Sequence, residues 1–166
     1  MADDSNQEAK VFSVETRFQK MARRPGGVSR DKALARAQSN IDELKPEFSG
    51  WLDRELQELT VAIRLLESHP QDVFRIEEAH RRSCQLRDVG TTMGFELVTI
   101  ISHNVCKILA AIKDGAPYHK DTVDCHLDAL VLTSKAPYCH MRPEQVPEMT
   151  GGLRRLVEQA ITSKSN

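Results

Sequence analysis

Four side chains that can take part in polar or nucleophilic chemistry recur along one predicted helix: His80, Cys84, Arg87 and Thr91. An α-helix turns by about 100° per residue, so this spacing places all four along one line, with Asp88 beside it. A thiol becomes a strong nucleophile only when its pKa is depressed, and Arg87, one turn from Cys84, is the visible cause for such a shift. We call this line the polar ridge and expect it to face solvent.

Glycine stands at an unexpected place on the opposite side of the same helix. Ser83, Leu86, Gly90 and Met93 share the face that we expect to point inward. Glycine inside a helix costs about 1 kcal/mol relative to alanine. Gly90 therefore predicts either a close approach of another backbone or partner, or, together with Gly94, only the fraying end of a helix.

Cysteine and histidine are direct neighbours at two other places, Cys125-His126 and Cys139-His140. Adjacent side chains on a helix diverge by about 100° and cannot share one metal ion without a second element folding over them. We expect His126 to pack or to form a hydrogen bond, and His103 and Cys106 to lie on the flank of a helix. The pattern predicts no metal site.

Sequence motifs of nucleotide-dependent and hydrolytic enzymes are missing. The chain contains no phosphate loop G-x-x-x-x-G-K-[ST], no nucleophile elbow G-x-S-x-G and no H-E-x-x-H. ATP-dependent kinase chemistry would have no nucleotide site. We therefore expect a protein that is not an enzyme and has no cofactor.

The elements that must position these side chains are helices, because apolar residues recur at helical spacing throughout the chain after residue 29. The stripes comprise Ala33, Ala37, Ile41 and Leu44; Leu52, Leu56, Leu59, Ile63 and Leu66; Val73, Ile76, Ala79, Ser83, Leu86, Gly90 and Met93; Leu97, Val98, Ile101, Val105, Ile108, Leu109 and Ile112; Val123, Leu127, Leu130 and Val131; and Met149, Leu153, Leu156, Val157 and Ala160. No stretch alternates with period two, as a strand would. The sequence predicts an all-α fold.

The arrangement we expect is an antiparallel four-helix bundle with flanking N- and C-terminal helices. Its four members are predicted near residues 51–67, 71–92, 95–113 and 120–134. The first flanking helix is expected to end at Pro46. The last, which carries the stripe from Met149 to Ala160, either packs across the bundle or forms a homodimer.

Helix-breaking and polar residues near the start of the chain predict two regions. These are a flexible N-terminal arm over 1–29 and a helical bundle domain over 30–166. The segment "ARRPGG" (22–27) should interrupt any ordered element there. The surrounding basic stretch "RFQKMARRPGG" (17–27) favours docking to a protein partner over binding to DNA.

Composition limits the partners. The 166 residues include 23 basic and 24 acidic side chains, so the formal net charge is −1. This balance argues against nucleic acid or an anionic membrane as the main partner. The four cysteines have no paired spacing, and neither a signal peptide nor a membrane-spanning apolar run is visible. We expect a cytoplasmic protein.

The stretch "CQLRDVGTTMGFELVTIISHNVCKIL" (84–109) resembles the signature of bacterial histidine-phosphotransfer (Hpt) domains, whose central helix reads His-x-Leu-Lys-Gly-x-x-x-x-Leu-Gly. Matching positions hold Leu86, Arg87, Met93, Gly94, Phe95, Leu97 and Val98. The segment "CHLDAL" (125–130) is similar to a His-x-Asp-Ala-Leu segment of alphaproteobacterial members. The resemblance covers about residues 48–135 and implies a module of a two-component phosphorelay.

The resemblance fails at the phosphoacceptor. Cys84 occupies the position equivalent to the family's acceptor histidine, and Asp88 replaces the glycine that gives a partner room beside the imidazole. Arg87 keeps the positive charge of the family's lysine. In a second register His80 is the alternative acceptor, but Arg82 and Ser83 then stand where leucine and lysine belong.

The resemblance implies binding to the receiver domains of response regulators or hybrid kinases. The partner-binding residues would be Arg87, Asp88, Gly90, Thr91 and Gly94. Because Cys84 replaces the acceptor histidine, we expect a degenerate, non-transferring adaptor in signal transduction. The alternatives are an active phosphocarrier that uses His80 and a helical protein-interaction module unrelated to phosphorelays.

Overall fold

Helices make up the regular structure of the described part of the chain. The computed structural model describes Arg17 and residues 26–162, and no strand occurs among them. The α-helices are α2 (Arg30–Ser68), α3 (Val73–Met93), α4 (Glu96–Lys113), α5 (Lys120–Thr133) and α6 (Pro147–Thr162), and two short 3₁₀-helices, η1 (Tyr138–His140) and η2 (Pro143–Gln145), join α5 to α6. The predicted all-α fold is confirmed over these residues. The arm predicted over 1–29 falls mainly on 1–16 and 18–25, which lie outside the described residues.

Helix α2 is longer than the sequence pattern predicts. It continues through position 46, so the expected helix end at Pro46 is wrong. Proline costs a helix one amide donor and about 3 kcal/mol. Phe48 and Leu52, which follow it, are buried in the core, and this burial offsets much of that cost. The chain divides into two compact units, Met1–Asn40 and Ile41–Asn166, and α2 begins in the first and continues into the second.

The second unit contains the apolar core, to which α2, α3, α4, α5 and α6 all contribute. Its buried members are Phe48, Leu52, Leu56, Leu59, Ala62, Ile63, Leu66, Ile76, Ala79, Leu86, Phe95, Val98, Ile101, Val105, Ile108, Leu109, Ile112, Val123, Leu127, Ala129, Leu130, Leu153 and Val157. The predicted stripes account for most of these residues. Val73 and Val131 are half exposed, and the stripe from Ala33 to Leu44 contributes no residue to this core, since Ala33, Ala37 and Leu44 are exposed.

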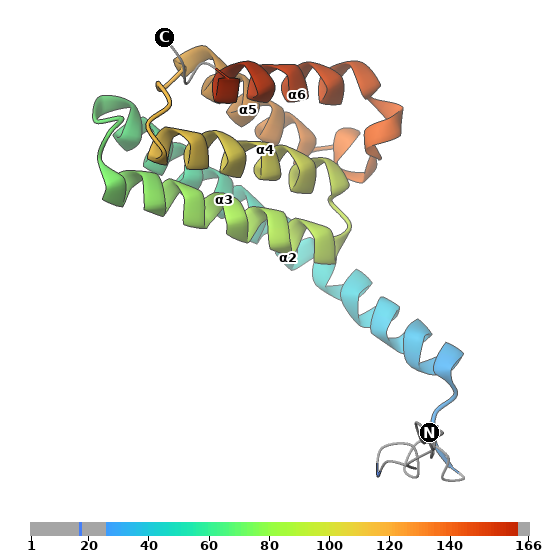
Figure 1. Cartoon of the computed structure of the whole chain (residues 1–166). Helices are drawn as coiled ribbons and strands as arrows, with labels where there is room; N and C mark the ends of the chain where they lie inside the picture. Colours follow the sequence, from blue (N-terminus) through green and yellow to red (C-terminus); the bar gives the residue numbers. More distant parts are fainter. Residues whose placement is uncertain (1–16, 18–25, 163–166) are drawn as a thin grey trace, which may run out of the picture. The chain divides into compact units, whose positions relative to one another are not determined.

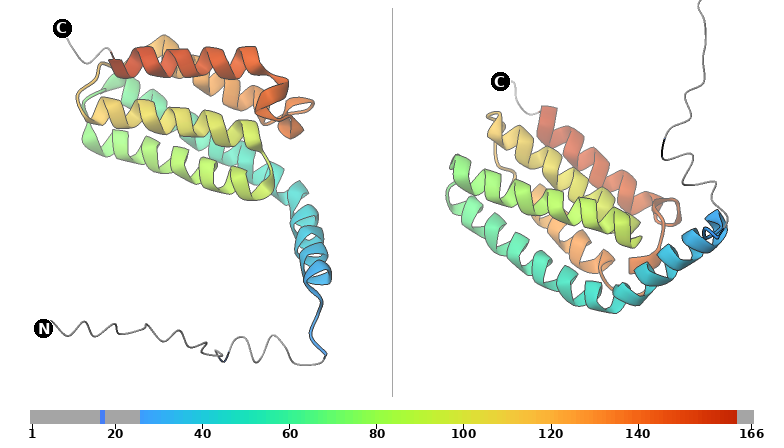
Figure 2. Two further views of the ribbon diagram at one scale, coloured as in Figure 1. Left: turned by 45° about the vertical axis from the view of Figure 1, so that its right-hand side comes forward. Right: turned by 90° about the horizontal axis from the view of Figure 1, so that it is seen from below.

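Helix α4 has α3, α5 and α6 as neighbours. It runs antiparallel to α3, to which a tight turn connects it, and α6 lies across α4 and α5 (Figure 1). The α2 segment of the second unit runs beside α3 and α5 (Figure 2). None of the described helices combines the length and the apolar character that crossing a membrane requires.

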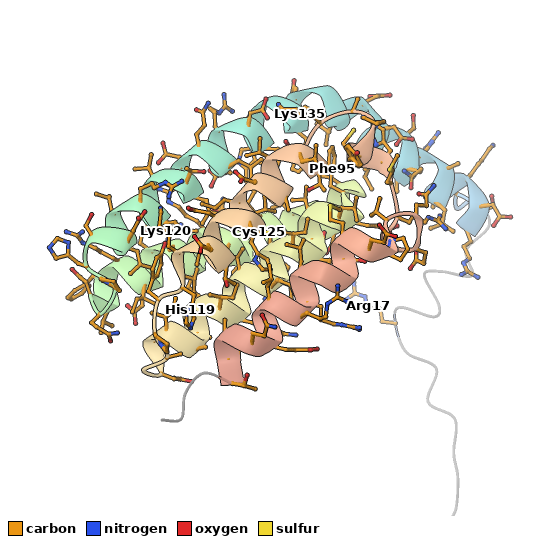
Figure 3. The ribbon with its side chains drawn as sticks, turned by 90° about the horizontal axis from the view of Figure 1, so that it is seen from above. Arg17, Phe95, His119, Lys120, Cys125 and Lys135 are labelled. Atoms are coloured by element: carbon orange, nitrogen blue, oxygen red, sulfur yellow. The ribbon has the colours of Figure 1, made fainter. Side chains whose placement is uncertain are left out.

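Ion pairs tie α2 to its two neighbours. On the α5 side, Lys120 Nζ lies 2.7 Å from Glu67 Oε1, and Lys135 pairs with Asp53. Figure 3 shows these two lysines near the opposite ends of α5. On the α3 side, Arg82 contacts Glu55 at 3.7 Å. These pairs fix the position of α2 along α3 and α5 more than they add stability, because exposed pairs contribute little.

Both ends of α3 are capped. The Asp72 carboxylate accepts hydrogen bonds from the amides of Phe74 at 3.0 Å and Arg75 at 3.3 Å. At the other end Gly94 adopts φ 79°, in the left-handed region that glycine tolerates best. The Phe95 amide then donates to the Gly90 carbonyl at 2.9 Å, which closes the turn into α4. Gly94 therefore marks a defined helix end.

Helix α4 approaches α3 closely at Gly90. A Cβ atom at this position would lie 2.8 Å from Thr99 Oγ1 and 3.4 Å from the Thr99 amide nitrogen. The close approach of another backbone, which the sequence predicted as one of two explanations for Gly90, is confirmed, and the neighbour is the first turn of α4.

We expect Gly90→Ala to lower the free energy of unfolding by about 1–2 kcal/mol, because overpacking outweighs the gain in helix propensity. Gly50→Ala is the matched control: Gly50 also lies in a helix, but nothing stands within 4 Å of its added Cβ. That variant should gain about 0.5–1 kcal/mol. Urea denaturation measures both. A Gly90→Ala protein as stable as the wild type would contradict the close approach, and Gly90→Ala with Thr99→Ala should recover most of the loss.

Candidate functional site on helix α3

The polar ridge of α3 reaches the surface. His80, Cys84 and Arg87 are partly exposed and Thr91 is exposed, whereas Leu86 on the opposite face is completely buried. The helical phase predicted for α3 is therefore confirmed. Ser83 also points inward, and its hydroxyl donates to the Ala79 carbonyl at 2.9 Å.

Arg87 is paired with its neighbour in sequence. Its Nε donates to Asp88 Oδ1 at 2.8 Å, and the Asp88 side chain is exposed. This hydrogen bond, followed by smaller Coulomb contributions from Cys84 and other groups, raises the pKa of Arg87. The Asp88 carboxylate thus offsets part of the positive charge of Arg87.

Cys84 has two neighbours that can bind or react with sulfur. Its Sγ lies 3.4 Å from Cys106 Sγ on α4 and 3.7 Å from His80 Nδ1 one turn earlier on α3. Cys106 is only 4% exposed. Burial, followed by the hydrogen bond with Cys84, raises the pKa of the Cys106 thiol to about 12.

The pairing of Cys84 with Cys106 was missed in the sequence. Cys106 does not lie on an exposed helix flank, as we expected, because it is buried against α3; His103 is exposed, as expected. A signal did exist: in two antiparallel helices joined by a tight turn, residues at similar distances from the turn face each other. Cys84 and Cys106 stand on opposite sides of Gly94 at such distances.

The other residues predicted to bind a partner divide between surface and interior. Thr91 Oγ1 donates to the Arg87 carbonyl at 3.1 Å and lies 3.4 Å from Thr99 Oγ1, which links the ridge to α4. Gly94 is exposed at the end of α3, whereas Gly90 is buried. The surface accessible to a partner therefore includes Arg87, Asp88, Thr91 and Gly94. Gly90 instead allows α4 to approach α3.

The two side chains of the dipeptide Cys125-His126 lie in different environments. Cys125 is exposed on α5, as Figure 3 shows, while His126 is completely buried. His126 Nδ1 lies 2.7 Å from the Thr122 carbonyl oxygen, so a neutral ring donates its Nδ1 proton there. The expectation that His126 packs and forms a hydrogen bond is confirmed.

Burial lowers the pKa of His126. The unfolded chain binds a proton at this residue below about pH 6.5, whereas the folded chain resists protonation, so stability is lost as the pH falls through this range. The free energy of unfolding can change through this one residue by at most about 1.4 kcal/mol per pH unit. We expect His126→Gln, which can still donate to Thr122, to reduce the loss of stability between about pH 7.5 and 5 by about 1–2 kcal/mol. Urea denaturation at the two pH values measures it, with Cys125→Ser as the exposed neighbouring control; an unchanged pH response would contradict the prediction.

Comparison with known proteins identifies no relative. No family model matches the chain, and no match is found among curated proteins or solved structures. The resemblance over residues 84–109 therefore depends on its residues alone, and a function must be argued from the polar ridge.

Proposed function

We propose that the chain is an Hpt-like module that binds receiver domains in a cytoplasmic two-component phosphorelay. Its framework would be an antiparallel four-helix bundle of α3, α4, α5 and the second-unit segment of α2, with α6 added outside. The shared core and the ion pairs from α2 to α3 and α5 support this arrangement.

The observation that carries the proposal is the partly exposed position of Cys84 within the polar ridge. The matching position in the family presents the acceptor histidine to the receiver. Binding between such proteins depends on the surface around the central residue as well as on that residue. Arg87, Asp88 and Thr91 supply a surface of this kind beside Cys84.

The adaptor has no group suited to accept the phosphoryl group at the central position. Cys84 is a thiol in contact with a second thiol rather than a free imidazole. The exposed Asp88 carboxylate would meet the acidic pocket of a receiver and its phosphoryl group, and this repulsion disfavours transfer. Association without transfer would sequester or modulate the receiver.

His80 supports the second candidate function, that of an active phosphocarrier. Its imidazole is partly exposed on the same ridge. Both of its ring nitrogens, however, lie within 4 Å of Cys84 Sγ, so the ring faces its neighbour on α3. The third candidate is a helical interaction module unrelated to phosphorelays.

Incubation of the full chain with phosphorylated receiver domains from the same organism tests the proposal. Complex formation and label transfer are followed together. We expect at least one receiver to form a complex while no label reaches the chain. Label that vanishes in His80→Ala would establish the carrier function, and the absence of any complex would favour an unrelated interaction module.

A further inference from the structure

Three donors that bind transition metals converge between α3 and α4. The sulfur atoms of Cys84 and Cys106 and an imidazole nitrogen of His80 all lie within 4.8 Å of one another. The residues come from two helices whose separation is set at Gly90, and they are distinct from the two Cys-His dipeptides. The prediction of no metal site did not consider this set, because Cys106 was expected on a helix flank.

The spacing of these donors suits a tetrahedral ion. With Zn–S bonds of about 2.3 Å and Zn–N bonds of about 2.0–2.1 Å, a tetrahedral site places two sulfurs about 3.8 Å apart and sulfur about 3.6 Å from nitrogen. The two sulfurs here are 3.4 Å apart, and Cys84 Sγ is 3.7 Å from His80 Nδ1. The third pair, Cys106 Sγ and the His80 nitrogen, lies within 4.8 Å. Forming the site therefore requires a small separation of the two sulfurs and an approach of the imidazole to Cys106.

One of the three proposed ligands is buried and the other two are partly exposed. Cys106 is buried, while Cys84 and His80 are partly exposed, so an ion could enter from the polar ridge and retain a water molecule as its fourth ligand. Arg87 lies close enough to interact electrostatically with both cysteines.

We propose that His80, Cys84 and Cys106 form a binding site for Zn²⁺. The ion forms bonds to both sulfurs and to one imidazole nitrogen, and the two thiol protons pass to solvent. The site cross-links α3 to α4 behind the polar ridge. This proposal does not depend on receiver binding, and its test uses no receiver.

A disulfide between Cys84 and Cys106 is the competing chemistry. It would need an oxidant to remove two electrons and would draw the sulfurs from 3.4 Å to about 2.05 Å. Zn²⁺ needs no oxidant and uses the histidine as well. The convergence of His80 on the two sulfurs favours the metal.

The test titrates the full chain, kept reduced by a phosphine and freed of metal, with Co²⁺ and then Zn²⁺. We expect one equivalent of Co²⁺ to give thiolate-to-cobalt charge-transfer absorption and the intense visible bands of a tetrahedral ion. Zn²⁺ should remove both signals. Absence of the charge-transfer band, or a reduced chain that binds no metal while oxidation yields the Cys84–Cys106 disulfide, would overturn the proposal.

Substitutions assign the ligands. We expect Cys84→Ser, Cys106→Ser and His80→Gln each to weaken Zn²⁺ binding by more than the roughly 10- to 100-fold that loss of a supporting hydrogen bond costs. Cys125→Ser, Cys139→Ser and His103→Gln are the matched controls and should bind like the wild type. If circular dichroism shows that Cys106→Ser does not fold, the two partly exposed positions decide: full affinity in both Cys84→Ser and His80→Gln would overturn the assignment.

Discussion

Cys84→His combined with Asp88→Gly should make the chain accept a phosphoryl group from a cognate receiver. The double substitution places an imidazole at a partly exposed position of the polar ridge and removes an exposed carboxylate that pairs with Arg87 at 2.8 Å. Freed from Asp88, the Arg87 guanidinium can attract the phosphoryl oxygens. We expect the rate of labelling to be at least about 100-fold above that of the wild type. A positioned catalytic side chain contributes rate increases of about this size, and the imidazole supplies the nucleophile.

Cys84→His alone should be labelled about tenfold more slowly than the double variant. Two unit charges about 4 Å apart interact by about 1 kcal/mol when the medium between them resembles bulk water, as it does for an exposed carboxylate, and a tenfold change in rate corresponds to about 1.4 kcal/mol. The variant Cys84→His with Asp88→Asn removes the negative charge of the carboxylate but keeps the side-chain volume. It therefore distinguishes the effect of charge at position 88 from the effect of steric crowding. The label should be acid-labile, as phosphohistidine is. A double variant that binds the receiver but stays unlabelled would show that Cys84 is not at the acceptor position.

Arg87→Glu should weaken receiver binding by about tenfold or more, while Cys84→Ala should change it by less than about threefold. Reversing a charge at an interface replaces attraction by repulsion, whereas truncating a small thiol removes little contact area. Calorimetry or fluorescence anisotropy with the best-binding receiver measures both effects.

Arg81→Glu is the matched control for Arg87→Glu. Arg81 also lies on α3, and it also pairs with an acid of the same helix, Glu78, at 2.8 Å. Arg81 lies about 120° around the helix axis from Arg87 and nearly two turns before it, so its reversal should leave the affinity within about twofold. Equal losses in the two variants would mean that the net charge of the chain, and not the polar ridge, governs binding.

The helices could be predicted from the sequence because their apolar periodicity is strong. Leu86, Ile101 and Leu130 were expected inside and are completely buried. The passage of α2 through Pro46 could not be predicted, because local propensity favours an end there and only packing of the following residues reverses it. Burial of Phe48 and Leu52 in the folded core outweighs the local preference for a helix end at Pro46.

Only one half of the candidate site could be predicted. The polar ridge follows from spacing along a single helix, so His80, Cys84 and Arg87 were found together. Cys106 belongs to another helix, and its contact with Cys84 depends on how far the two helices slide along each other. The close approach of Thr99 at Gly90 is compatible only with a narrow range of positions of α4 along α3. The ion pair between Arg87 and Asp88 likewise depends on rotamers that spacing does not determine.

Chemical-shift mapping by NMR tests the central claim most directly. The isotope-labelled full chain is titrated with the unlabelled receiver that binds it best. We predict that the largest shifts fall on residues 80–94 and on the first turn of α4, while a parallel filter assay with the receiver carrying a radiolabelled phosphoryl group detects no transfer of that phosphoryl group to the chain. Shifts confined to α5 and α6, with α3 unchanged, would contradict the account.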